Sequence, residues 1–227
     1  MRTRYPMASA LVGALFTSIA QGGVILQPTG AVTTSIDGGT TPAMGSLDGF
    51  GPERAIDQSG LLDGYITGVT DFDAYMATNP VHQSNISNFY WLSQPGNPTV
   101  GFFDFDLGGY YTIEAMALWN FGEDGGQNVQ VFDLVVADNP DFTGGTSFLV
   151  DPVDVNTGPS DAVLPQVFEI TPTGGRYVRM EILANNGNPD FVSFGEAAFE
   201  VTVPEPGSVS LVALAATGLL LRRRRRI

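Results

Sequence analysis

Residues 102–119, with the sequence FFDFDLGGYYTIEAMALW, decide the fold of this chain. Side chains along a β-strand point alternately to the two faces of a sheet, so apolar and polar residues in strict alternation indicate a half-buried strand. Over residues 99–107 the apolar Phe103, Phe105 and Leu107 alternate with Asp104 and Asp106. Residues 111–119 alternate too, but both of their faces are fairly apolar, which predicts a strand covered on two sides.

The same rule finds further strands on either side of this stretch. Residues 129–137 are apolar on both faces, whereas residues 177–183 place Arg179 and Glu181 outward. Gly, Pro, Asn and Asp separate the strands, and no long stretch has a helical period, so we predict an all-β, antiparallel sandwich. The expected inward positions of the last two strands are Val178, Met180, Ile182, Ala197, Phe199, Val201 and Val203.

Charge and cysteine content narrow the possible partners. The chain has no cysteine, so no disulfide stabilises it. Without the basic residues of the two termini, and without Glu205, three arginines face 23 acidic residues, a net charge near −20. This charge repels phosphate backbones and excludes nucleic acid as a partner. It suits either a protein in salty surroundings or carboxylates gathered for divalent cations.

The N-terminus has the features of a secretory signal peptide. Arg2 and Arg4 precede an apolar run over residues 7–19, and small residues at the end of that run predict cleavage after Ala20. We therefore expect a signal peptide over 1–20, a lead-in with an N-terminal strand over 21–42, and the sandwich domain over 43–203.

The C-terminus, residues 204–227, combines three features in order. A Pro-Glu-Pro motif is followed by an apolar segment over 208–221, expected to be a transmembrane helix, and by five arginines. We expect the apolar segment to stop in the membrane with its arginines on the cytoplasmic side. Residues 207–221 would span ~22 Å of a hydrocarbon core of ~30 Å, which is marginal for a permanent anchor. The motif and the basic cluster are Pro204, Glu205, Pro206, Arg222, Arg223, Arg224, Arg225 and Arg226.

This tail closely resembles the PEP-CTERM sorting signal of bacterial envelope proteins. The resemblance implies that a membrane enzyme of the exosortase type cuts near the motif. We expect export through the inner membrane, transient anchoring by the C-terminal helix, and then transfer to the cell surface or the extracellular matrix. The alternative is a simple membrane anchor.

A second resemblance covers residues 43–203. Six short motifs stand in the order seen in discoidin-like domains, which resemble the C-type domains of coagulation factors and have a galactose-binding-like jelly roll. The resemblance implies a jelly-roll sandwich that binds carbohydrate. The motifs are Ala55-Ile56-Asp57, Trp91-x-Ser93, Asp106-Leu107-Gly108, Tyr111-Thr112-Ile113, Arg176-Tyr177-Val178-Arg179, and Gly195-Glu196 followed by Phe199-Glu200.

Many sugar-binding relatives of this kind hold a structural calcium ion. Carried onto this sequence, the resemblance implies Asp57 and Glu196 as ligands, with Asp63 as a third carboxylate and carbonyls such as that of Ala55 completing the shell. Calcium takes six to eight oxygen ligands, so such a set is chemically suitable. The alternative is that these carboxylates are ordinary surface charges of an acidic protein.

Sugar recognition requires an exposed aromatic ring and a few polar groups. The aromatic-rich segment before Trp91 and the turn after Trp119 supply candidates, whereas Trp91 itself is expected in the core. We choose Tyr65, Tyr75, His82 and Phe121 as the contacts with an exopolysaccharide or a cell-surface glycan, neutral or cationic.

Catalysis has little support in the sequence. His82 is the one histidine, and neither a G-x-S-x-G nor an H-E-x-x-H motif occurs. A glycoside hydrolase would need two carboxylates ~5 to 9.5 Å apart across a cleft, and Asp71/Asp73, Asp104/Asp106 and Glu123/Asp124 are the candidate pairs. We predict a protein that is not an enzyme: a carbohydrate-binding module or, alternatively, a structural acidic matrix protein. An exposed aromatic cluster would favour the first.

Overall fold

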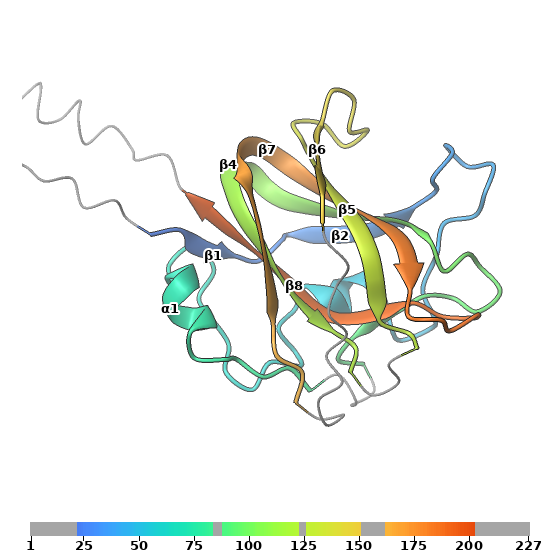
Figure 1. The fold of residues 1–227 in the computed structure, drawn as a ribbon, viewed down its shortest axis with the longest axis horizontal. Helices are drawn as coiled ribbons and strands as arrows, with labels where there is room; N and C mark the ends of the chain where they lie inside the picture. The colour runs from blue at the N-terminus through green and yellow to red at the C-terminus, as the bar shows by residue number, and fades with distance from the viewer. Residues whose placement is uncertain (1–21, 84–87, 123–125, 151–161, 203–227) are drawn as a thin grey trace, which may run out of the picture.

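Strand β4 (Gly101–Asn120) runs through both layers of a β-sandwich (Figure 1). The computed structural model describes residues 22–83, 88–122, 126–150 and 162–202. The first half of β4 pairs with β2 (Gly30–Thr34) and with the second half of β7 (Gln166–Asn185). The second half of β4 pairs with β8 (Ser193–Thr202) and with the first half of β7. The two long strands therefore join the layers.

A bulge in β4 produces the change of layer. Asp106 pairs with Tyr177 and Tyr111 pairs with Gly175, so residues 107–110 of β4 have a single residue opposite them. Gly108 lies in this bulge with a φ of +77°, a left-handed conformation that favours glycine. We expected two strands over 99–107 and 111–119; the structure joins them into one bent strand because the two adjacent glycines allow a bulge.

The remaining strands extend the two layers. The first sheet runs β2, β4, β7, β5 (Val129–Ala137) and β6 (Thr146–Leu149), and the second runs β7, β4, β8 and β1 (Val24–Leu26). β3 (Trp91–Leu92) pairs with β8. β1 and β2 come from the lead-in segment 21–42. β6 lies in the segment between β5 and β7.

The core between the layers follows the expected alternation. Phe103, Phe105 and Leu107 are at most 1% exposed, and Asp104 and Asp106 point to the other face. The inward positions of β7 and β8 are buried as well, and Trp91 is completely buried. The prediction of an all-β, antiparallel sandwich is confirmed. The buried inward positions are Val178, Met180, Ile182, Ala197, Phe199 and Val201.

The segment between η1 (Pro52–Ala55) and β3 covers the outer face of the second sheet. Within it lies α1 (Phe72–Met76), whose first turn is capped by the side chain of Asp71. Phe72 packs in a second apolar cluster with Trp119 of β4 and Ala198 of β8. The two-sided coverage predicted for residues 111–119 is thus confirmed.

The terminal signals lie outside the described residues. This applies to the signal peptide expected over 1–20, to Val203, and to the sorting tail over 204–227. Within the part of the chain that the structure describes, no helix has the length and apolar character needed to cross a membrane.

Candidate functional site

The four residues chosen as sugar contacts are all buried. Tyr65 and Tyr75 are each 7% exposed, Phe121 is 5% exposed, and His82 is not exposed at all. The rings of Tyr65 and Tyr75 meet edge to face with centroids 5.4 Å apart. The expectation that these side chains are exposed is wrong, because the apolar outer face of the second sheet requires a cover and the aromatic-rich segment supplies it.

His82 is part of this cover. Its backbone exchanges hydrogen bonds with Val163, with N···O distances of 2.9 and 3.0 Å. Its imidazole lies against Gly60, where a Cβ would come within 2.2 Å of Nε2, so only glycine leaves room for the ring. Burial lowers the pKa of His82 to about 4, although the charge of nearby Asp57 opposes the shift. The imidazole is therefore neutral at physiological pH.

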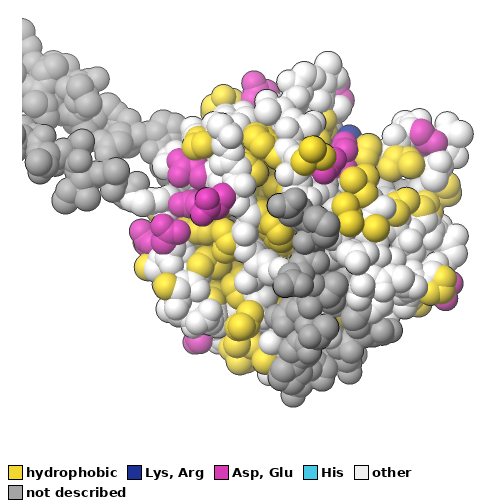
Figure 2. All heavy atoms as spheres, in the orientation of Figure 1, with side chains coloured by type: hydrophobic (Ala, Val, Ile, Leu, Met, Phe, Trp, Pro, Cys, Tyr) yellow, Lys and Arg dark blue, Asp and Glu magenta, His cyan; other side chains and the backbone are white. Residues whose placement is uncertain are grey.

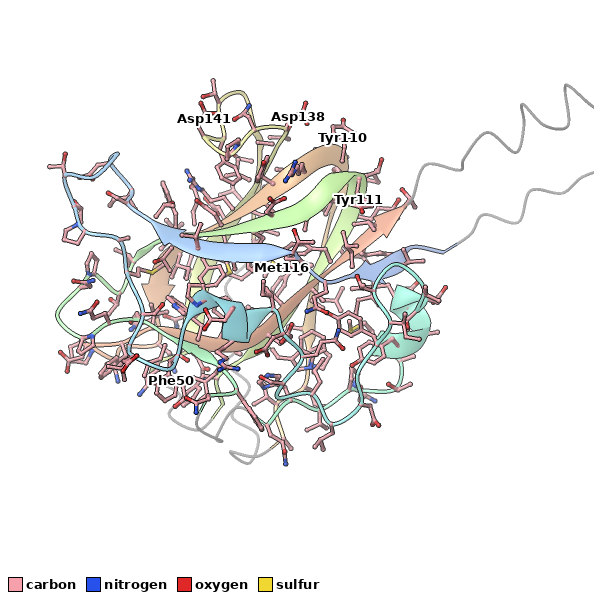
Figure 3. All side chains as sticks on the ribbon, turned by 180° about the vertical axis from the view of Figure 1, so that it is seen from behind. Phe50, Tyr110, Tyr111, Met116, Asp138 and Asp141 are labelled. Carbon is pink, nitrogen blue, oxygen red and sulfur yellow. The ribbon has the colours of Figure 1, made fainter. Side chains whose placement is uncertain are left out.

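Phe121 belongs to a row of rings at one end of the sandwich. Its ring lies 4.6 Å from that of Tyr90, which lies 4.9 Å from that of Phe50. The backbone N–H of Phe121 donates to Asn128 Oδ1 at 2.7 Å. Figure 3 shows Phe50 at the end of the molecule opposite Tyr110 and Tyr111, which lie at the bend of β4.

Two of the three proposed calcium ligands lie close together. Glu196 is completely buried; its Oε2 accepts a hydrogen bond of 3.0 Å from the backbone N–H of Gln58, and its Oε1 has no hydrogen-bond partner. Burial raises the pKa of Glu196 well above its usual range; the Gln58 hydrogen bond opposes this shift and the charge of Asp57 adds to it. A buried carboxylate with one unsatisfied oxygen beside a second carboxylate is suited to a cation.

Asp63 does not join them. Its side chain is exposed, and its backbone carbonyl accepts the hydrogen bond of the Tyr75 hydroxyl. Asp57 is itself engaged, because it accepts hydrogen bonds from the Ser59 N–H at 2.9 Å and from Arg54 Nη1 at 3.1 Å. In the described ranges no three His, Cys, Asp or Glu side chains are grouped so that they could hold a metal.

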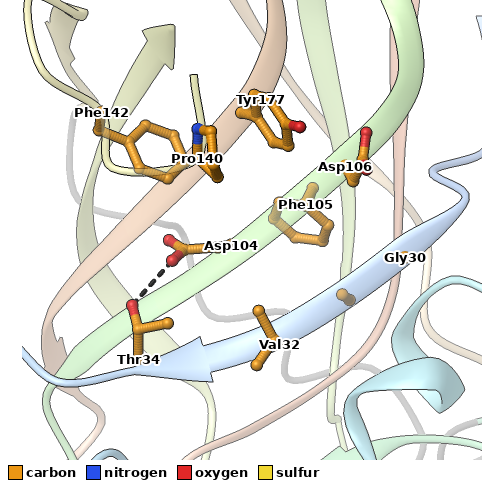
Figure 4. A pocket seen from close by; sticks show the side chains of 10 residues that line it. Gly30, Val32, Thr34, Asp104, Phe105, Asp106, Pro140, Phe142 and Tyr177 are labelled. Atoms are coloured by element: carbon orange, nitrogen blue, oxygen red, sulfur yellow. Dashed lines mark hydrogen bonds between the residues drawn. The ribbon is translucent and has the colours of Figure 1, made fainter. Parts of the chain in front are cut away.

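The outer face of the first sheet holds two adjoining pockets that the sequence did not predict. The first pocket has a volume of about 450 Å³, and the second about 570 Å³. Figure 4 shows Pro140, Phe142 and Tyr177 along one side of the first pocket, β2 along the other, and Asp104 of β4 between them. The second pocket is lined by residues that include Ile36, Phe102, Asp141 and Arg179.

Two ion pairs form the polar part of this surface. Arg179 holds Asp104 through bonds of 2.6 and 2.8 Å, and Arg176 holds Asp106 through two bonds of 2.8 Å. The hydrogen bonds from Arg176 lower the pKa of Asp106. Arg176 is 43% exposed at its side chain, and a guanidinium has five N–H donors of which Asp106 takes two. It can therefore still donate to a ligand.

Arg179 fixes the loop between β5 and β6 against the sheet. Its guanidinium carbon lies 4.0 Å from the ring centroid of Phe102 and 4.1 Å from that of Phe142. Its Nη2 also lies 3.3 Å from Thr34 Oγ1, which donates to Asp104. The Arg179 guanidinium is stacked between two rings and bonded at two nitrogens to one carboxylate, which makes this part of the surface rigid.

These contacts bear on the carboxylate pairs considered for a glycoside hydrolase. Asp104 and Asp106 are each neutralised by an arginine, and Asp71 caps α1. Glu123 and Asp124 lie outside the described residues. Neither of the described pairs thus consists of two free carboxylates facing each other.

Acidic side chains gather elsewhere as well. Figure 2 shows them close to where the termini leave the domain, whereas basic side chains appear at one place on the face shown, beside acidic and hydrophobic ones. Burial raises the pKa of Glu200, and Asp73, Glu114 and Glu169 add to the shift through their charges. These carboxylates lie close enough to repel one another.

The sequence did contain a signal for the pockets. Arg54, Arg176 and Arg179 are the basic residues between the two terminal signals, and two of them lie in or beside a predicted strand with apolar alternation. Asp104 and Asp106 occupy the outward positions of another predicted strand. Pairing these two strands would have predicted two neutral ion pairs on one outer face.

The comparisons with known proteins concern the fold. No family model matches this chain, and no curated protein matches it. The CBM32-3 module from a family 31 glycoside hydrolase of Clostridium perfringens is similar in structure, with a TM-score of 0.53 at 13% identity over 79% of this chain and 96% of that one.

Two other solved structures are similar at lower scores. A fucose-binding module from Streptococcus pneumoniae has a TM-score of 0.48 at 12% identity, covering 81% of this chain and 99% of that one. A family 32 module from Clostridium perfringens NanJ, solved with galactose, has 0.45 at 13% identity, covering 75% and 91%. The first structure shows that this chain shares the antiparallel β-sandwich fold of that CBM32 module.

Proposed function

We propose that this chain is an exported, non-catalytic module that binds carbohydrate on the outer face of its first sheet. The observation that carries the proposal is the first pocket, which combines the half-buried ring of Tyr177 with Asp106. Arg176 pairs with this carboxylate at the border of the pocket. The fold, shared with a carbohydrate-binding module, supports the proposal but does not by itself give a ligand.

The chemistry of the pocket matches that of a sugar. A pyranose ring has an apolar face of C–H groups and a rim of hydroxyls. Tyr177 and Val32, which is 53% exposed, offer apolar surface to the ring face. A sugar hydroxyl can donate a hydrogen bond to Asp106 or accept one from Arg176, so the pair can bind hydroxyls as donors and as acceptors.

A glycan array followed by isothermal titration tests this proposal. We expect the purified protein to bind at least one glycan, and Tyr177→Ala to weaken that binding at least tenfold. Tyr110→Ala is the matched control, because Tyr110 is 61% exposed and lines neither pocket. An array without any signal at high protein and calcium concentrations contradicts the proposal.

We also propose that a calcium ion is held by Asp57 and Glu196. The support is the buried, unsatisfied Oε1 of Glu196 beside Asp57. When bound, calcium would compensate the buried carboxylate and tie the start of the domain to its last strand. Calcium titration by calorimetry, with the double variant Asp57→Ala/Glu196→Ala as control, tests this; heat that is absent in both proteins, or equal in both, contradicts it.

Export and sorting complete the proposal. The N-terminal signal, the Pro204-Glu205-Pro206 motif and the arginines that follow support passage across the inner membrane and processing by an exosortase-type enzyme. Intact-mass analysis of the surface-exposed protein should show loss of residues 1–20 and of the five C-terminal arginines. Surface material that still carries Arg222–Arg226 contradicts the processing.

The second candidate function is a structural acidic matrix protein without a sugar site. The burial of Tyr65, Tyr75, His82 and Phe121 favours it, because these aromatics form a cover and not an exposed cluster. Calcium-dependent self-association in sedimentation, together with an array without signal, would support this candidate over the first.

A further inference from the structure

The geometry points to a groove that binds an internal stretch of a neutral polysaccharide chain, with sugar residues in both pockets at once. This inference rests on the proposed function, which by itself requires no more than one sugar in one pocket. It specifies the class of glycan: an extended, uncharged chain and not a single terminal sugar.

The two pockets are continuous along β2. The first pocket includes Gly30, Ala31 and Val32, the second includes Thr33, Ser35 and Ile36, and Thr34 lines both. Each volume lies within the ~300–1,000 Å³ of ordinary small-ligand sites. A ligand that fills both must therefore be longer than one that fills either.

Arg179 separates the two pockets, and contacts within the protein already hold its side chain in place. Arg179 of the second pocket bonds Asp104 of the first, and its guanidinium lies between Phe102 and Phe142. The Arg179 side chain is 14% exposed. A chain that crosses here meets a rigid ridge of Arg179 and Thr34, which sets the spacing between the two sugar positions.

The far side of the groove is open. β2 pairs with β4 and, within the described residues, with no other strand, so it forms the edge of the first sheet. Val32 of β2 and Ile36, which follows β2, are 53% and 46% exposed and give this edge of the groove an apolar surface. An open edge admits a chain that continues past the site, whereas capture of a terminal sugar requires a closed pocket.

Charge selects a neutral chain. Arg176 and Arg179 are each paired with a carboxylate of β4, so neither offers an uncompensated positive charge to a uronic acid. Asp141 of the second pocket is exposed, and the whole domain is strongly acidic. The negative charge of the domain would repel a polyanionic chain, whereas it does not repel a neutral chain.

Isothermal titration with matched pairs of sugars tests the inference. The probes are glucose with cellohexaose, mannose with mannohexaose, and mannuronate hexamers as the anionic case. We expect the purified protein to bind one neutral hexasaccharide at least tenfold more tightly than its monosaccharide, and the mannuronate hexamer at least tenfold more weakly than the neutral one.

Two filling variants locate the effect. Ile36→Trp blocks the second pocket, and we expect it to reduce the ratio of hexasaccharide to monosaccharide affinity to about one while leaving monosaccharide binding intact. Val32→Trp blocks the first pocket and should abolish both. Both positions are exposed and suit a large side chain, so folding should be preserved; Tyr110→Ala is the control that should change nothing.

The outcomes separate the two proposals. Equal affinities for monosaccharide and hexasaccharide in the unaltered protein, or unchanged binding in both filling variants, overturn the groove but leave carbohydrate binding standing. An affinity for the mannuronate hexamer equal to that for the neutral hexasaccharide overturns the inference that the groove selects an uncharged chain. Binding of no sugar at all overturns the proposed function together with this inference.

Discussion

The outer faces of the two sheets differ, although β4 contributes residues to both: one face is covered and the other is open. Along the second half of β4 the outward residues are small or apolar, with Ala115, Ala117 and Trp119 at most 1% exposed under the segment that carries α1. Along its first half the outward residues are Asp104 and Asp106, and the surface stays open as the two pockets.

The difference lies in the cost of covering each face. Small alanines leave room for the rings of Tyr65, Phe72 and Tyr75, and burying those rings is favourable. Two Asp–Arg pairs would be expensive to bury completely, since each charge would lose its water. In this chain the aromatic-rich segment therefore forms a cover, and the outward charges mark the face that stays open.

The largest effect should come from removing a ring from the covered face. Trp119 is completely buried, and its indole N–H donates to the carbonyl of Pro80 at 2.8 Å. Trp119→Ala should lower the free energy of unfolding by about 3–5 kcal/mol, measured by urea denaturation. Val167→Ala, at a position that is 42% exposed, is the control; equal losses for both would mean that the cover does not seal this face.

A smaller loss is expected from the rigid ridge of the open face. Arg179→Ala leaves Asp104 without its guanidinium in a site where the two side chains are 14% and 10% exposed. We expect a loss of about 2–3 kcal/mol, somewhat below the cost of breaking a fully buried pair. In a double-mutant cycle Asp104→Ala should cost little more on top of Arg179→Ala. Strict additivity would show that the pair contributes nothing.

The cover should also make stability depend on pH through His82. The pKa of His82 is about 4 in the folded protein, against a usual value of 6.5. The unfolded chain therefore binds a proton at His82 more readily than the folded protein does. The stability that the neutral, buried imidazole contributes is complete above pH 6.5 and is lost as the pH falls toward 4. Between pH 6.5 and 5 the loss should be about 2 kcal/mol. His82→Gln, measured by denaturation at several pH values, should lack this component; an identical pH profile would indicate that water reaches the ring.

The smallest effect is expected at the exposed ion pair. Arg176 and Asp106 are 43% and 32% exposed at their side chains, and solvent screens such pairs strongly. Arg176→Ala should therefore change the free energy of unfolding by about 0–1 kcal/mol, while weakening glycan binding. A loss as large as that of Arg179→Ala would mean that this end of the groove is structural.

The strands were predictable because alternation is a local property. Phe103, Phe105 and Leu107, like Val178, Met180 and Ile182, could be assigned inward from sequence, and residues 129–137 match β5. The site was less predictable. Tyr65, Tyr75, His82 and Phe121 were expected to be exposed, but which aromatics are covered depends on where residues 60–83 dock, and that contact is long-range.

The sequence by itself determined the strands, their inward faces and the class of the fold, because each depends on residue order within a strand. The joining of residues 101–120 into one bent strand, the burial of the aromatic-rich segment and the pairing of Asp104 with Arg179 were decided by tertiary structure alone. Asp104 and Arg179 are 75 positions apart, and only strand pairing brings them within 2.6 Å. Which face of the sandwich stays open is settled by such distant contacts.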